Sequence, residues 1–173
     1  MSDTFLVLTV IGDDKPGLVE QLSSTISCHQ GNWLESSMSH LAGQFAGIVR
    51  VAVPHAQSEP LKAALAALGG LKITAETSQE QKSASTGRRL KLSLVGHDRI
   101  GIVREVAQIL AKHAVNVEEL NTYTSSAPMS AETLFHAQAE LFAGAGLDAR
   151  ALKAELERLS DDLMVDITLD ETI

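Results

Sequence analysis

The sequence is poor in the residues on which several classes of protein depend. Aromatic residues make up only 3% of the 173, which argues against a module that stacks RNA bases on aromatic rings. Cys28 is the one cysteine, so an internal disulfide and a metal site built from cysteine pairs are excluded. No run of about 18 apolar residues and no basic apolar leader occurs. We therefore expect a soluble, cytoplasmic protein with no membrane partner.

Positive charge is also scarce. The chain has 14 basic and 22 acidic residues, which gives a net charge of −8. The charge is −3 over residues 1–84 (5 basic, 8 acidic) and −5 over residues 85–173 (9 basic, 14 acidic). Neither half has the basic excess that binding to a phosphate backbone requires, so we expect no direct contact with nucleic acid. The hydrophobic share of 45% indicates a globular chain, and its cores must be aliphatic.

A short stretch occurs twice in the chain. Residues 12–19 read Gly-Asp-Asp-Lys-Pro-Gly-Leu-Val, and residues 96–103, 84 positions later, read Gly-His-Asp-Arg-Ile-Gly-Ile-Val. An ungapped alignment of 6–35 with 90–119 leaves 9 of 30 positions identical. These are Leu6, Leu8, Gly12, Asp14, Gly17, Val19, His29, Asn32 and Glu35. A repeat of this length predicts two domains, 1–78 and 88–173, joined by a polar linker at 79–87.

The hydrophobic pattern predicts the same order of elements in both copies. Alternating or continuous apolar runs indicate strands, and apolar residues at helical spacing indicate helices. The expected strands cover 5–11, 32–41, 45–53 and 71–77 in the first copy, and 90–95, 116–126, 132–142 and 163–169 in the second. We expect Gly31 to end the first helix and Ser58-Glu59-Pro60 to begin the second. The order βαββαβ predicts an α+β fold: two ferredoxin-like domains, each a four-stranded antiparallel sheet with two helices on one face.

The repeated turn follows the first strand of each copy and precedes its first helix. Gly12 would permit a φ value forbidden to other residues, and Gly17 would let a ligand or another backbone approach closely. The helix begins with unpaired N–H groups, which suit a carboxylate, and Asp14 or Asp98 beside it could accept an ammonium group. Such a pair is what a free amino acid requires. On the turn alone, an aspartate that caps the helix is the simpler interpretation.

This motif after an apolar strand, the βαββαβ order and an asparagine at the start of the second strand resemble ACT domains, small regulatory modules that bind amino acids. Two such domains in a short chain resemble the glycine cleavage system transcriptional repressor family. The resemblance implies ligand sites at an interface, formed by pairing within the chain or in a homodimer. The implied ligand-binding residues are Gly12, Asp13, Asp14, Pro16, Gly17, Leu18 and Asn32 in the first copy, and Gly96, His97, Asp98, Ile100, Gly101, Ile102 and Asn116 in the second.

The repressor resemblance further implies regulation through a LysR-type activator of glycine cleavage genes, with glycine relieving the repression. Asp13 and Pro16 become His97 and Ile100 in the second copy, so the two sites need not bind the same ligand. Asn32 suits a turn after a helix as well as it suits a ligand site.

The competing function is an enzyme on the same fold, such as an acylphosphatase-like hydrolase. Lys15 and Arg99 lie near the turns, but the acids beside them would repel a phosphate. The sequence shows no paired carboxylates, no Ser–His pair and no metal-ligand spacing. We therefore expect no catalytic residues, no metal and no cofactor. His29 and His113 are expected to cap helix ends, and Cys28 to be a small packing residue.

Overall fold

The computed structural model describes residues 3–78, 86–163 and 165–172. The chain divides into two compact units, Met1–Lys82 and Ser83–Ile173, and each is described here by itself. Of the segment expected as a linker, residues 79–85 lie outside the described residues, and Gly87 is the first residue of a strand. None of the helices in the described ranges is long and apolar enough to cross a membrane.

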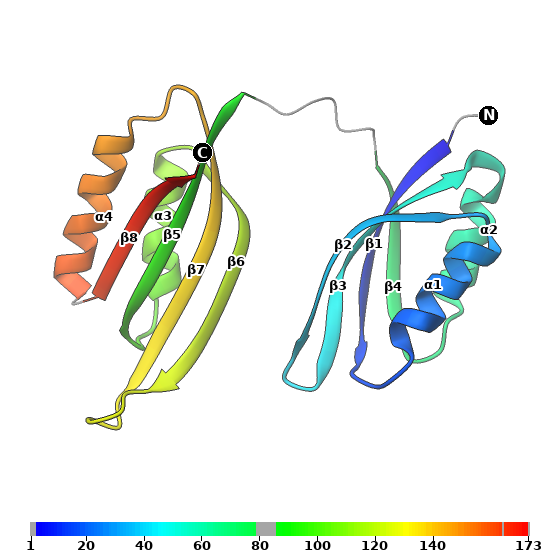
Figure 1. Ribbon diagram of the computed structural model, residues 1–173, viewed down its shortest axis with the longest axis horizontal. Helices are drawn as coiled ribbons and strands as arrows, with labels where there is room; N and C mark the ends of the chain where they lie inside the picture. The colour runs from blue at the N-terminus through cyan, green and yellow to red at the C-terminus, as the bar shows by residue number, and fades with distance from the viewer. Residues whose placement is uncertain (1–2, 79–85, 164, 173) are drawn as a thin grey trace. The chain divides into compact units, whose positions relative to one another are not determined.

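Each unit has the element order βαββαβ (Figure 1). The elements of the first unit are β1 (Asp3–Asp13), α1 (Leu18–Cys28), β2 (Asn32–Leu41), β3 (Gln44–Pro54), α2 (His55–Ala66) and β4 (Lys72–Ser78). Those of the second are β5 (Gly87–His97), α3 (Ile102–Lys112), β6 (Val115–Ser126), β7 (Thr133–Gly144), α4 (Ala149–Leu163) and β8 (Val165–Thr172). The sheets are antiparallel, in the orders β2-β3-β1-β4 and β6-β7-β5-β8. Both helices of each unit cover one face of its sheet, so the predicted fold class is confirmed.

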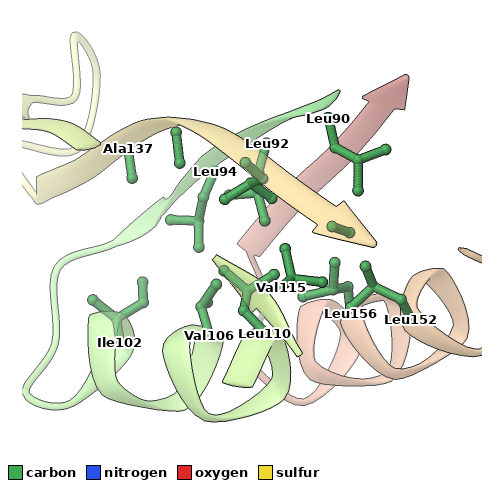
Figure 2. Close-up of a cluster of buried hydrophobic side chains, with 13 residues drawn as sticks. Leu90, Leu92, Leu94, Ile102, Val106, Leu110, Val115, Ala137, Leu152 and Leu156 are labelled. Atoms are coloured by element: carbon green, nitrogen blue, oxygen red, sulfur yellow. The ribbon is translucent and has the colours of Figure 1, made fainter. Parts of the chain in front are cut away.

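Strand alternation decides which face of each sheet is covered. In β1, Leu6, Leu8 and Val10 are buried against the helices, while Val7 and Thr9 point to the other face. The uncovered surface is called the open face below. The core of the second unit lies between its sheet and helices α3 and α4 (Figure 2). The buried residues of both cores are aliphatic, as the scarcity of aromatic residues predicts.

Two predicted helix boundaries are wrong. Helix α2 begins at His55, directly after Pro54, and Pro60 lies inside it rather than at its start. The left-handed residue that follows α1 is Gln30, with φ 59°, rather than Gly31. The N–H groups of Gln30 and Gly31 bond the carbonyls of Ser27 and Ile26, which is the Schellman arrangement. Gly31 is needed for space instead, because an added Cβ would lie 2.8 Å from Cγ2 of Ile26.

Gln30→Gly is expected to stabilise the first unit by about 1 kcal/mol, because it removes the cost of a side chain in the left-handed conformation. Chemical denaturation of the purified protein measures this change. Ser27→Gly, three residues earlier and also exposed, is the matched control and should destabilise the helix by about 0.5–1 kcal/mol. Equal losses for the two variants would contradict the assignment of strain to Gln30.

Candidate functional site

The helix that follows each repeated turn begins without a side-chain cap. Gly17 and Gly101 hold the N-cap positions of α1 and α3 with φ of 92° and 91°, and no described side chain caps either helix. The first helical bonds run from the N–H groups of Gln21 and Glu105 to the two glycine carbonyls. The N–H groups of the first turn therefore remain available to an anion. The interpretation of the aspartates as caps is wrong.

The two glycines of the first turn have exchanged their expected roles. Gly12 lies in regular strand β1, opposite Phe45 of β3. An added Cβ there would lie 2.3 Å from the carbonyl oxygen of Gly70, so Gly12 is required for a close approach of backbone. Gly17 has the left-handed φ, and nothing lies within 4 Å of an added Cβ. The space beside the start of α1 is thus open. Gly96 occupies the place in β5 that Gly12 has in β1.

In the first turn, both acids are held by the β2–β3 hairpin. Asp13 accepts a hydrogen bond of 2.7 Å from the amide of Gln44. Asp14 pairs with Nδ1 of His40 at 2.5 Å, and its N–H donates to the carbonyl of Gly43 at 3.0 Å. Pro16, the next candidate residue, is exposed. An ammonium group at this turn would have to share Asp14 with His40.

In the second turn, the aspartate is left open. The N–H of Asp98 donates to the carbonyl of Thr133 at 3.0 Å, but its exposed carboxylate has no partner among the described residues. The ring of His97 lies 3.4 Å from the carboxylate of Glu132, and Arg99 pairs with Glu105. Ile100 is fully exposed. The second turn therefore offers a free carboxylate three residues before Gly101, the N-cap of an uncapped helix.

Four other candidate residues lie in the cores or at the other end of the sheet from the turns. Leu18 and Ile102 are 4% and 3% exposed and belong to the two cores. Asn32 lies opposite Ala52, at the other end of the sheet from Gly12. The separation is seven residues along β1, or about 23 Å at about 3.3 Å per residue. Asn116 has the corresponding place in the second sheet. Neither unit by itself brings its asparagine to its turn.

The histidines at the helix ends differ from each other. Nδ1 of His29 bonds the carbonyl of Thr25 at 2.9 Å, so the expected cap is confirmed there. His113 instead lies 3.4 Å from Glu155, which also pairs with Lys112 at 2.6 Å. The hydrogen bond from Lys112, together with the charges of Lys112 and His113, lowers the pKa of the Glu155 carboxyl. Cys28, expected to pack, is exposed.

One pair of chemically active side chains was missed by the sequence reasoning. The β6–β7 register brings Oγ of Ser125 to 2.7 Å from Nε2 of His136. The ring of Tyr123 stacks on His136 with a centroid distance of 4.4 Å. A Ser–His pair acts as a nucleophile only when a third group orients the ring and donors stabilise the oxyanion. No described residue bonds Nδ1 of His136, and the described residues contain no metal-binding group of three or more His, Cys, Asp or Glu side chains.

Comparison with known proteins agrees with the observed fold. The ACT domain family model matches residues 4–72, and the second unit repeats the same fold. Residues 4–72 therefore form an ACT domain, and residues 87–172 repeat its order of elements. A crystal structure of an unknown protein from Galdieria sulphuraria is 30% identical, with a TM-score of 0.89, covering 99% of this chain and 100% of that one. No match was found among curated protein sequences.

A second crystal structure shares the fold over its whole length. It is described as a "putative glycine cleavage system transcriptional repressor" and is 17% identical, with a TM-score of 0.72, covering 99% of each chain. At 17% identity, this likeness shows a shared fold and nothing further.

Proposed function

We propose that the protein is a non-catalytic regulator that responds to a free amino acid. The observation that carries the proposal is the repeated, uncapped helix start that follows an aspartate. An added Cβ would meet nothing within 4 Å at Gly17, and at Gly101 only the side chains of Glu105 and Arg104, at 3.8 and 4.0 Å. An α-amino acid presents a carboxylate and an ammonium group within a few ångströms of each other. The helix start suits the first group and the aspartate suits the second.

The second turn is the stronger of the two sites in this proposal. The carboxylate of Asp98 is free among the described residues, whereas that of Asp14 is occupied by His40. A ligand at Asp98 would place its own carboxylate at the first N–H groups of α3. Ile100, which is fully exposed, supplies an apolar rim that a neighbouring domain or second copy would cover. The ligand then favours whichever arrangement binds it better, and this population shift is the regulatory signal.

The partner in this proposal is a protein rather than DNA. The net charge of −8 opposes binding to a phosphate backbone. By analogy with the repressor whose fold it shares, the target would be a LysR-type activator of glycine cleavage genes, the ligand would be glycine, and the site of action would be the cytoplasm. The protein would pair its ACT domains within one chain or in a homodimer.

Isothermal titration with glycine, serine and branched amino acids tests the ligand site. Asp98→Asn is expected to weaken binding by about ten- to hundredfold, because it removes a charged partner of the ammonium group. Asp14→Asn should have a smaller effect, since His40 already occupies that carboxylate. Asp161→Asn, an exposed aspartate in the last turn of α4, is the control for net charge. Glycine or serine binding that survives unchanged in Asp98→Asn would contradict the proposal, as would no binding of any of these amino acids.

A further inference from the structure

Glu35 is a repeated residue that the turn sites do not use. It is identical to Glu119 in the second copy. Both edge strands carry a register irregularity directly before this glutamate, between Trp33 and Glu35 in β2 and between Val117 and Glu119 in β6. An irregularity of this kind re-aims the side chains that follow it. Both copies therefore place a glutamate directly after a strand irregularity, far from the turn.

In the first unit, this glutamate lies on the open face beside a cation. Glu35 is paired in register with Arg50, which is itself opposite Val7 of β1. Val7 points away from the helices, because its neighbours Leu6 and Leu8 are buried against them. Nη1 of Arg50 lies 3.2 Å from Oε1 of Glu35, and its guanidinium lies 4.9 Å from the centroid of the Phe5 ring.

A hollow of about 580 Å³ surrounds this ion pair on the open face. It spans all four strands of the sheet, and its lining includes Val7, Glu35, Ser37, Ile48 and Arg50. The volume lies within the range of small-molecule sites, about 300–1,000 Å³. Ile48 is 54% exposed, and Val7 is only partly covered. The hollow thus contains one cation and one anion beside an apolar floor.

The ion pair leaves recognition groups on both partners. The guanidinium has five N–H donors, of which Glu35 accepts one, so another edge can hold a carboxylate. The second oxygen of Glu35, whose side chain is 69% exposed, can accept from an ammonium group. Both charges of an α-amino acid would then be matched, and a branched aliphatic side chain would cover Val7 and Ile48.

The second unit lacks this combination although it keeps the glutamate. The residue opposite Lys91 of β5 is Glu140, in the place that Arg50 takes opposite Val7. Glu119 is therefore paired with a second acid, and Lys91 bonds Glu140 at 3.3 Å. The smaller hollow there, about 330 Å³, is lined by Lys91, Glu119, Asn121 and Glu140. The floor of this second hollow is polar, whereas the floor of the first is apolar. The second hollow therefore serves as an internal control.

We propose that the open face of the first sheet binds a free amino acid with a branched aliphatic side chain, held between Arg50 and Glu35 over Val7 and Ile48. This site is separate from the turns and does not depend on the function proposed for them. It would give the protein a second, chemically distinct ligand.

Titration of the full chain with L-leucine, followed by NMR of backbone amides, tests this site. We expect saturable shifts centred on Val7, Ile48 and Arg50. Arg50→Gln and the exposed Glu35→Gln should each weaken leucine binding by about tenfold or more. Isoamylamine and 4-methylvalerate, which each lack one charge, should bind more weakly than leucine. Absence of leucine binding, or binding unchanged in both variants, would overturn the proposal.

Two controls separate this site from the turns. Lys91→Gln alters the equivalent hollow of the second unit and should leave leucine binding unchanged. Asp98→Asn should leave leucine shifts on the open face intact while weakening a ligand at the second turn. Leucine shifts that map to Gly17 or Gly101 instead would refute the open-face site and support the turn.

Discussion

Replacing Leu8 with alanine is expected to lower the free energy of unfolding of the first unit by about 2–5 kcal/mol. Leu8 is fully buried in the centre of β1, and truncation leaves a cavity under α1 and α2. The second unit has a separate core, so its unfolding should be unaffected. Heat or denaturant unfolding followed by amide NMR in each unit would show one transition moving to weaker conditions and the other unmoved.

Leu92→Ala is the matched control for this experiment. Leu92 takes the same place in β5, where it is 3% exposed, and belongs to the second core. It should shift the second transition and spare the first. If either variant moves both transitions equally, the two units unfold together, and their separate cores do not unfold independently.

Gly12→Ala is expected to destabilise the first unit by about 1–3 kcal/mol, the usual cost of forcing a methyl group into a packed site. The added Cβ would meet the carbonyl oxygen of Gly70 at 2.3 Å, and backbone cannot rotate away as a side chain can. The same change should disturb the start of α1, because β1 leads directly into the turn. Denaturant unfolding measures the first effect.

Gly69→Ala is the control, because Gly69 directly precedes Gly70 in the chain. An added Cβ at Gly69 meets nothing within 4 Å, and its φ is not left-handed. Its effect should stay within about 0.5 kcal/mol. A similar loss for both variants would show that glycine flexibility, rather than the close approach at Gly12, sets the cost.

Features fixed by local sequence were predicted from it. The nearly continuous apolar run over 5–11 predicted strand β1, and the 84-residue repeat predicted a second copy with the same order of elements. The repeat also located the turn that holds Gly17 and Gly101 at the two helix starts. Such features depend on neighbours within a few residues, whose spacing the sequence displays directly.

Features that depend on strand register were missed. Asp14 meets His40 from 26 residues away, and Ser125 meets His136 across the β6–β7 hairpin. Which side chains face each other there follows from the length of each hairpin, which has no reliable pattern in one sequence. The different reasons for Gly12 and Gly17 were also hidden, because composition does not tell a crowded glycine from a left-handed one.

The main-chain bonds from Asp14 to Gly43 and from Asp98 to Thr133 tie each turn to the tip of its own hairpin. In the first unit that hairpin carries β2, the outermost strand of the sheet. We therefore expect a displacement of the turn to move the tip of this hairpin, and with it an edge strand whose outer backbone groups are not paired within the described sheet. The turn and the hairpin tip would then move together while the core of the unit keeps its packing.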